Sequence, residues 1–468
     1  MKKYQELLKN ILLFIIASFI PKTLAFFMVP LYTRYLSTTD YGTADLLSNT
    51  VTLLMPVLTL QIQDAVMKYT IQNKYSRKDI FSVGTIIVFV GGSILVIGCL
   101  GINFTKAFYI ERTFLVFLCI NYFTGSLNNI FSYFCRGINK VKIITIGSIA
   151  NSVVTIICNL LFLVICGWGL TGYLIANSLG NIIQVIILCC GADLISYFHI
   201  KIESIEMLHQ MIKLSIPMIF SALSWWVNNA ADKYILTYFC GVSIVGIYAV
   251  SSKIPTILST FGDVIAKSFA ISAIKEIDIE DTDGFLGKSY SIISLGMTII
   301  CSIIMIMNIW LAHFLFSKNF YEAWKMVPPL LLSVSFNQLS WTCENILLAV
   351  GKTKVLSWTA VLGAGINVAL NIIIIPFWGA YGAAVTTVIG FCCTWVARYW
   401  ILNKHVKLKH NFGKELVSYI LLILQVCIAY YGNDYILIQG ILLAIIISIY
   451  YKEIITIGGK IIKKNGFL

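Results

Sequence analysis

The sequence predicts an all-α polytopic membrane protein of about 14 transmembrane helices, arranged as two repeated six-helix lobes and a C-terminal helix pair. Its composition, the spacing of its apolar windows and an internal repeat predict this fold. Hydrophobic residues make up 59 % of the 468 residues and charged residues 12 %, which is about half the charged fraction of a soluble domain. So small a polar remainder cannot cover a water-soluble surface, so most of the chain must face lipid.

Windows of roughly 18 to 22 apolar residues mark helices that span a membrane. Such windows follow one another along the whole chain, separated by short connections. We expect spans at 8–34, 42–67, 80–104, 113–135, 143–166, 171–195, 209–238, 243–271, 286–316, 327–350, 355–376, 380–402, 415–431 and 434–451.

The two halves of the chain repeat each other. The motif Trp168-Gly-Leu-Thr-Gly172 recurs 210 residues later as Trp378-Gly-Ala-Tyr-Gly382, and the basic turn at Arg136 recurs 214 residues later at Val350. Duplicated helix bundles are typical of secondary transporters, whose substrate site lies between the repeats. We therefore expect an N-terminal lobe over 1–200, a C-terminal lobe over 201–410, and the helix pair with a cytoplasmic tail over 411–468.

The formal net charge of +13 is explained by membrane topology rather than by nucleic acid. An even number of spans places both termini on one side, and most of the 34 Lys and Arg residues then fall in loops on that side. By the positive-inside rule both termini are expected in the cytoplasm of a bacterial cell, with the spans in its cytoplasmic membrane. The opposite side carries only five basic residues: Arg34, Lys106, Arg112, Lys318 and Lys325.

Prolines interrupt the first, second, seventh and eighth predicted spans, which are partners in the repeat. Each is expected to break its helix, because proline removes a backbone hydrogen bond. Such breaks are tolerated in membranes where the helix lines a wet cavity. The residues are Pro21, Pro30, Pro56, Pro217 and Pro255.

Several motifs of soluble enzymes are better interpreted as structural elements. Gly167-x-Gly169-x-x-Gly172 matches a dinucleotide fingerprint in letters, but it joins two long apolar helices and is expected to be a turn. The acidic stretch 275–284 has the wrong carboxylate spacing for a calcium loop and is expected to be a solvated cytoplasmic loop. No Walker-type loop or hydrolase motif appears, and the 13 cysteines form no C-x-x-C pair, so we expect no cofactor and no certain metal site.

Charged residues inside the spans are the candidate functional residues, because an ionised group at mid-bilayer is costly unless it faces an aqueous cavity. Lys22 and Lys253 lie deep in their spans and beside prolines. Lys233 is a weaker candidate because the adjacent Asp232 is a ready partner, and Lys68 lies near the cytoplasmic boundary. The acidic candidates, which could carry protons, are Asp64, Asp263 and Glu344.

A second group of candidates is mainly uncharged. Asn367 and Asn371 are four residues apart on one helical face, and Thr386 and Thr387 lie in the next span. With Asp232, these oxygens could form a shell for a hard cation. Ordinary hydrogen bonding between helices is the alternative, and the residue types alone favour it.

The two six-helix copies, the Tyr41-Gly42 turn after the first helix and the paired Trp-Gly-x-x-Gly turns together resemble a known family. The chain is similar to polysaccharide-export flippases of the Wzx type, in the multidrug/oligosaccharidyl-lipid/polysaccharide superfamily, over essentially its whole length. The resemblance implies a MATE-like fold that moves an undecaprenyl-diphosphate-linked oligosaccharide outward by alternating access, without ATP.

The resemblance also implies roles for particular residues. Related lipid II flippases hold the pyrophosphate with basic residues of helices one, two and eight. Lys22 and Lys253 match helices one and eight, while helix two offers Asp64 and Lys68. Relatives also have a sodium site that matches Asp232, Asn367, Asn371 and Thr387, although an acid stands where this chain has Asn371, so coupling to either Na⁺ or H⁺ is expected.

The partners expected from the resemblance are the lipid-linked glycan, membrane lipid, and the polymerase and chain-length proteins of surface polysaccharide synthesis, for capsule, O-antigen or exopolysaccharide. Two other functions stay open. A multidrug or cation antiporter of the same superfamily would favour acidic and aromatic cavity residues. A membrane polysaccharide polymerase, which is an enzyme, would need large outer loops or an acidic catalytic motif.

Overall fold

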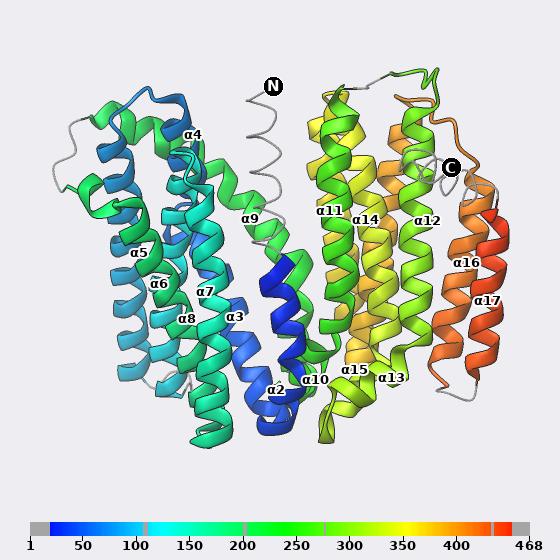
Figure 1. Cartoon of the computed structure of the whole chain (residues 1–468), viewed down its shortest axis with the longest axis horizontal. Helices are drawn as coiled ribbons and strands as arrows, with labels where there is room; N and C mark the ends of the chain where they lie inside the picture. Colours follow the sequence, from blue (N-terminus) through cyan, green and yellow to red (C-terminus); the bar gives the residue numbers. More distant parts are fainter. Residues whose placement is uncertain (1–18, 106–110, 200–203, 276–277, 432–434, 452–468) are drawn as a thin grey trace, which may run out of the picture. The chain divides into compact units, whose positions relative to one another are not determined.

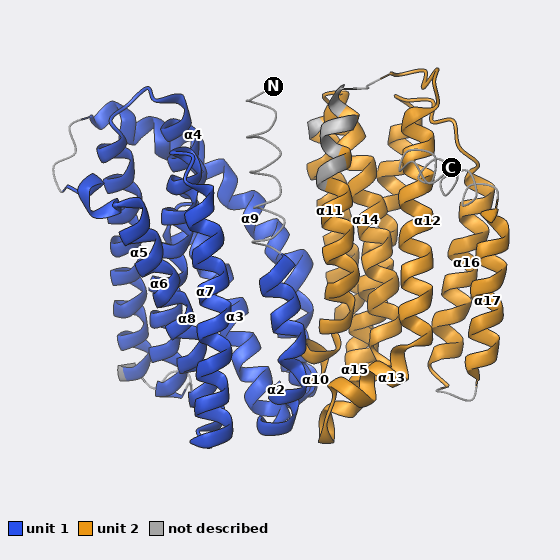
Figure 2. Ribbon diagram, in the orientation of Figure 1, with its two compact units in different colours: residues 1–246 blue, residues 247–468 orange. Residues whose placement is uncertain are grey.

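The structure, a computed structural model, describes residues 19–105, 111–199, 204–275, 278–431 and 435–451. In this part of the chain the regular elements are helices, and no β-strand occurs, so the prediction of an all-α fold is confirmed. The chain divides into two compact units, Met1–Gly246 and Ile247–Leu468 (Figure 2).

Unit 1 begins, in its described part, with a helical stretch over residues 19–27 that turns at Met28 into the next helix. Its elements then follow in chain order (Figure 1): α2 Val29–Tyr35, α3 Thr38–Leu58, α4 Gln63–Gln72, α5 Arg77–Thr105, α6 Arg112–Gly137, α7 Val141–Asn159, the π-helical η1 Leu160–Ile165, α8 Gly169–Ala192, the 3₁₀ turn η2 Leu194–Tyr197 and α9 Ile205–Cys240.

The helix α10 (Val242–Ser251) contains the boundary between the units. Unit 2 continues with α11 Lys253–Lys275, α12 Phe285–Ile306, α13 Asn308–Leu315, η3 Lys318–Lys325, α14 Val327–Ala349, α15 Thr353–Asn403, α16 Phe412–Ala429 and α17 Ile436–Ile449. The unit boundary falls later than residue 200 because α9, a helix of the second sequence repeat, packs on α3 of the first. The predicted lobes describe the sequence repeat and stay a prediction.

Seven helices of the described chain are long and apolar enough to cross a membrane, or nine if each of two bent pairs forms one span. One of them, residues 354–403, contains both the eleventh and the twelfth predicted span. Residues 8–18 of the first predicted span and both termini lie outside the described residues. The chain is a multi-pass membrane protein, and the count of fourteen spans stays a prediction.

The two Trp-Gly-x-x-Gly motifs form matching turns. Gly169 and Gly379 have φ of +52° and +53°, a conformation that glycine adopts without strain. The second glycine of each motif packs tightly: a Cβ at Gly172 would lie 3.1 Å from Cβ of Trp168, and one at Gly382 would lie 3.1 Å from Cβ of Trp378. The motif is therefore a helix-connecting turn, as predicted, and it folds alike in both copies.

The basic turns also match, but with a different offset from the one expected. Asn139 and Gly351 are the left-handed residues, and the next residue, Lys140 or Lys352, donates its backbone N–H to the carbonyl five residues earlier. Asn139 therefore corresponds to Gly351, 212 residues later, and the predicted offset of 214 is wrong. Asn and Gly both suit this helix-ending conformation, so the turn could not be aligned by identity alone.

Of the five prolines predicted to break helices, three lie at or near a break, namely Pro30 after the turn at Met28, Pro56 and Pro255, and two do not. The pair α3–α4 is bent by 53° after Pro56, where Leu60 and Gln61 have φ of +52° and +50°. The pair α10–α11 is bent by 43° just before Lys253. The expectations for Pro21 and Pro217 are wrong, because the helical stretch 19–27 continues through Pro21 and α9 continues through Pro217. One lost hydrogen bond does not end a helix of 36 residues whose flanking turns are intact.

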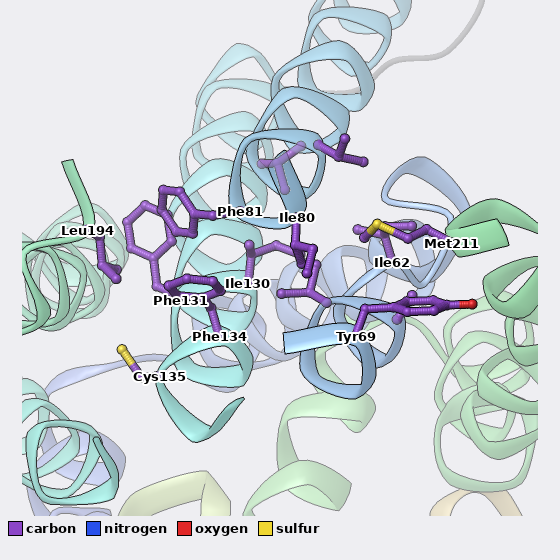
Figure 3. Packing of buried hydrophobic residues seen from close by; sticks show 14 of the residues in the cluster. Ile62, Tyr69, Ile80, Phe81, Ile130, Phe131, Phe134, Cys135, Leu194 and Met211 are labelled. Carbon is purple, nitrogen blue, oxygen red and sulfur yellow. The ribbon is translucent and has the colours of Figure 1, made fainter. Parts of the chain in front are cut away.

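The hydrophobic core at one end of unit 1 holds α4, α5 and α6 together. Phe81 packs against Phe131 and Phe134, with ring centroids 5.3 and 4.9 Å apart, and Figure 3 shows these rings meeting between the helices. Leu194 of η2 and Met211 of α9 belong to the same buried cluster. The core thereby fixes the end of unit 1 at which α5 begins.

The starts of α3 and α10 approach each other closely at one glycine in each helix. A Cβ at Gly42 would lie 2.2 Å from the Val242 carbonyl oxygen, and a Cβ at Gly246 would lie 1.9 Å from that of Thr38. The Thr38 and Ser243 hydroxyls add a hydrogen bond of 2.7 Å. Only glycine permits this backbone contact.

We predict that Gly246→Ala destabilises the protein by about 1–3 kcal/mol, because the backbones of α3 and α10 must separate. Thermal unfolding of the purified protein in detergent would measure the loss. Gly98→Ala in α5 is the matched control, since nothing lies within 4 Å of its Cβ position. Equal melting temperatures for the two variants would contradict the close contact.

Candidate functional site

A buried ion pair joins α3 to α9 within unit 1. Lys233 Nζ lies 2.9 Å from Asp45 Oδ2, and the two side chains are 14 % and 17 % exposed. Asn49, one turn after Asp45, donates its amide N–H to the same carboxylate at 2.9 Å. Both charges are thus neutralised and hydrogen-bonded, as buried charges must be.

Uncharged contacts reinforce this junction. Trp226 donates its indole N–H to the Asn49 carbonyl at 2.8 Å, and the hydroxyls of Thr50 and Tyr234 lie 2.8 Å apart. The rings of Trp226 and Tyr234 are 5.2 Å apart. The α3–α9 contact is therefore a continuous polar seam flanked by aromatic rings.

The structure pairs Lys233 with Asp45 and not with the side chain of its neighbour Asp232. Adjacent residues on a helix point in different directions, so the carboxylate of Asp232 accepts the backbone N–H of Lys233 instead, at 2.8 Å. Asp232 is 8 % exposed. Sequence analysis missed Asp45, although it is an acid inside a predicted span and four residues before Asn49.

The other candidates of unit 1 lie along the first two predicted spans. Lys22 is on the helical stretch 19–27 and is exposed within the structure. Asp64 is half-buried on α4 and accepts a hydrogen bond from Gln61 at 3.3 Å. Lys68, one turn further, is exposed with its Nζ 5.8 Å from the ring centroid of Tyr69.

In unit 2, Lys253 is the first residue of α11 and follows directly on the 43° bend. Its ammonium group makes no hydrogen bond or ion pair within the part of the chain that the structure describes. Asp263, further along α11, lies 3.5 Å from the amide nitrogen of Gln338 on α14. A lysine at a helix break lies beside backbone groups that the break has released, which is where transporters bind charged ligands.

Glu344 forms an ion pair with Arg398, a basic residue near the end of the predicted span 380–402. Arg398 is 5 % exposed on α15, and its Nη1 lies 2.6 Å from Glu344 Oε2. It also donates to the hydroxyls of Ser340 and Thr359, each at 3.0 Å. The role predicted for Glu344, that of a proton carrier, stays a prediction and would require this ion pair to open.

The cation-site candidates are divided between the units, with Asp232 in unit 1 and the others in unit 2. Within unit 2, Asn371 donates to Asn367 Oδ1 at 3.0 Å, and Thr386 donates to Asn371 Oδ1. Thr387 donates its hydroxyl along its own helix, to the Ala383 carbonyl at 2.8 Å. Both amide oxygens are therefore engaged, and a cation would have to displace these hydrogen bonds.

The acidic loop before α12 is more structural than its composition suggested. Asp281 is fully buried, and its carboxylate accepts the backbone N–H groups of Leu286, Gly287 and Lys409 at 2.9–3.0 Å. The expectation of a wholly solvated loop is therefore wrong at this residue. Hydrogen bonds from Thr282 lower the pKa of the neighbouring Asp278 carboxyl, which is on the exposed side of the loop.

We predict that Glu344→Gln lowers the stability of unit 2 by roughly 3 kcal/mol, because it leaves the buried Arg398 guanidinium without a counter-charge. Glu322→Gln is the control: it breaks an exposed pair with Lys325, which should cost less than about 1 kcal/mol. Thermal unfolding in detergent would compare them. If the two variants have the same melting temperature, the ion pair between Glu344 and Arg398 contributes no stability.

Comparisons with known proteins identify the family and the fold. Residues 7–269 match the family described as polysaccharide biosynthesis protein. An uncharacterised membrane protein of Methanocaldococcus jannaschii is 29 % identical over 265 residues, which cover 50 % of this chain and 50 % of that protein. The chain thus spans half the length of this curated relative.

Solved structures resemble the whole chain. The lipid II flippase MurJ, in an inward closed conformation, has a TM-score of 0.71 at 15 % identity, covering 95 % of this chain and 100 % of that one. An inward-facing MATE multidrug transporter of the MOP superfamily scores 0.65 at 13 % identity, covering 90 % and 99 %. A MOP transporter of Pyrococcus furiosus scores 0.57 at 11 % identity, covering 86 % and 95 %.

At these identities the structural likeness shows the fold, and the fold is the one that the sequence resemblance implied. The family expected from the sequence is confirmed by the match to the polysaccharide biosynthesis proteins, and the solved structures with this fold are described as transporters and flippases. With more than half of its residues matched, the chain belongs to the polysaccharide biosynthesis protein family and has the fold of MOP-superfamily transporters.

Proposed function

We propose that this protein is a flippase that moves undecaprenyl-diphosphate-linked oligosaccharide repeat units across the bacterial cytoplasmic membrane, for the synthesis of a surface polysaccharide. The observation that carries the proposal is the match to a polysaccharide biosynthesis family in a chain with a flippase-like fold. The transport would proceed by alternating access, with both termini in the cytoplasm. Its partners would be the lipid-linked glycan, membrane lipid, and the polymerase and chain-length proteins that use the flipped unit.

Lys22 and Lys253 are the proposed contacts for the diphosphate. Two ammonium groups can neutralise a diphosphate by charge-assisted hydrogen bonds, which are the strong ones in a low dielectric. The position of Lys253 at the start of α11, directly after a bend, supports this role. Lys233 is a weaker candidate because it would have to leave Asp45, and Lys68 is exposed near the end of α4.

We further propose that an inward Na⁺ or H⁺ gradient resets the carrier through Asp232, with Asn367, Asn371 and Thr387. A cation can bias the cycle only if two conformations bind it with different affinity. The hydrogen bonds among Asn367, Asn371 and Thr386 support the proposal, since a conformation that breaks them would bind the cation more tightly than one that keeps them.

Deletion of the gene should trap lipid-linked repeat units in the inner leaflet and abolish the surface polymer. Complementation with the wild-type gene should restore both. Radiolabelled lipid-linked intermediates and polymer staining would measure the effect. Normal polymer display combined with altered drug susceptibility would contradict the flippase and favour the multidrug antiporter.

Lys253→Gln should lower the flipping rate at least tenfold, because the ammonium charge opposite the diphosphate is lost, whereas Lys253→Arg should be milder since it keeps the charge. The assay is translocation of a lipid-linked oligosaccharide in vesicles, with insertion checked by membrane fractionation. Lys288→Gln, an exposed lysine of α12, is the control. Full activity in a Lys22→Gln/Lys253→Gln variant would remove both residues from the mechanism.

Asp232→Asn should weaken the dependence of transport on an imposed Na⁺ or H⁺ gradient more than it weakens binding of the lipid. The loss should exceed that of Thr387→Val, since a carboxylate contributes a full charge to a cation shell. Vesicles with opposite gradients provide the comparison. The coupling proposal fails if neither gradient alters the wild-type rate.

A further inference from the structure

Two histidines at corresponding places of the sequence repeat each bond a carboxylate and lie beside a serine. His199 follows α8 and η2, the sixth helix of the first copy, and His410 follows α15, which contains the twelfth. They are 211 residues apart, between the offsets of 210 and 212 that relate the two kinds of turn. The chain has five histidines, so this coincidence is specific.

The first cluster joins His199 to the start of α5. His199 Nε2 lies 2.6 Å from Asp79 Oδ1, and Nδ1 lies 3.2 Å from Ser82 Oγ. Asp79 and Ser82 are buried, and the His199 side chain is 30 % exposed. The backbone N–H of His199 also donates to Ser82 Oγ at 2.9 Å, and that hydroxyl lies 3.3 Å from the Tyr197 carbonyl.

A protonated His199 satisfies more hydrogen bonds in this cluster than a neutral His199 does. The Ser82 hydroxyl has one hydrogen, and with a neutral His199 it must choose between Nδ1 and the Tyr197 carbonyl. With a protonated His199, Nδ1–H donates to Ser82 and Ser82 donates to Tyr197. Every partner is then satisfied, and the bond to Asp79 becomes charge-assisted.

The second cluster joins His410 to α12 and α16. His410 Nδ1 lies 3.1 Å from Glu415 Oε1, and Nε2 lies 2.9 Å from the Tyr399 hydroxyl. Ser291, in the second turn of α12, donates to the same Glu415 oxygen at 2.7 Å. The side chains of His410 and Glu415 are only 3 % and 1 % exposed.

In the second cluster, the buried charge of Glu415 favours a protonated His410. The other carboxylate oxygen of Glu415 is buried and has no hydrogen-bond partner among the described residues. A neutral His410 would leave a net negative charge in this dry site, whereas an imidazolium cancels it. The Tyr399 hydroxyl can accept from Nε2–H or donate to bare Nε2, so it accommodates both states.

Other titratable and charged groups lie near each histidine. Near His199 or Asp79 in the chain are a tyrosine, the acid that ends α8 and two exposed basic residues, and a cysteine belongs to the buried cluster against which that tyrosine packs: Tyr197, Asp193, Arg77, Lys78 and Cys135. Around His410 they are tyrosines and a cysteine, an arginine already paired with Glu344, an exposed lysine and a half-buried lysine: Tyr290, Tyr399, Tyr419, Cys343, Arg398, Lys409 and Lys414.

We propose that the two clusters are proton-binding clamps, one in each repeat, that fasten the start of α5 or α12 to the chain segment after the sixth helix of its copy. Imidazole is the side chain that changes charge between about pH 5 and 8. Each clamp is tight when its histidine is protonated and loosens as the pH rises. In the proposed topology both clamps face the cytoplasm, so they sense cytoplasmic pH, whatever substrate the protein carries.

Hydrogen–deuterium exchange of the purified full-length protein in detergent tests the clamps. After correction for the intrinsic pH dependence of exchange, the starts of α5 and α12 should open about tenfold less at pH 6 than at pH 8, the effect of one charge-assisted hydrogen bond. His199→Gln should abolish this difference at α5 and leave it at α12. His410→Gln should do the reverse.

His209→Gln, at an exposed position of α9, is the matched control and should keep both differences. If a histidine variant does not fold, Asp79→Asn and Glu415→Gln remove the carboxylate charge with little change of shape and should abolish the same differences. A pH dependence that survives in the His199→Gln/His410→Gln variant would overturn the proposal. The measurement involves no transport, so its failure is distinguishable from failure of the proposed function.

Discussion

Each charge that this chain carries into an apolar environment needs a partner, and that constraint organises both units. Asp45 and Lys233 satisfy it across α3 and α9, and Glu344 and Arg398 satisfy it across α14 and α15. Separating the two charges of a buried pair costs several kcal/mol of stability, so these contacts fix which helices lie side by side. The charged residues that remain for a ligand are therefore few, and Lys253, directly after a helix bend, is the clearest of them in unit 2.

The two copies of the repeat share the backbone geometry of their turns as well as their order of helices. The two Trp-Gly turns share a left-handed glycine and a second glycine packed on the tryptophan. The basic turns share a left-handed residue and the same long-range hydrogen bond, and the histidine clusters occupy corresponding ends of both copies. The same local solutions recur because each copy must end and restart its helices at the same places.

The two copies nevertheless form some of their contacts with different helices. The contact of Gly42 with α10 and of Gly246 with α3 is nearly symmetric. In contrast, the buried carboxylate at the first histidine comes from α5, and at the second it comes from α16, in the C-terminal helix pair. The added helix pair thus supplies a polar group within unit 2, which ties it to the repeated bundle.

Sequence alone determined the membrane setting and the all-α class, because composition and periodicity report directly on lipid burial. Its repeated motifs indicated the duplication, and their resemblance to those of known flippases indicated the family. It also found most charged residues inside the spans. It could not assign their partners: Lys233 pairs with Asp45, 188 residues away, and Glu344 pairs with Arg398, 54 residues away. It likewise expected Pro217 to break α9. Pairing depends on which helix faces pack together, and only the tertiary structure decides that.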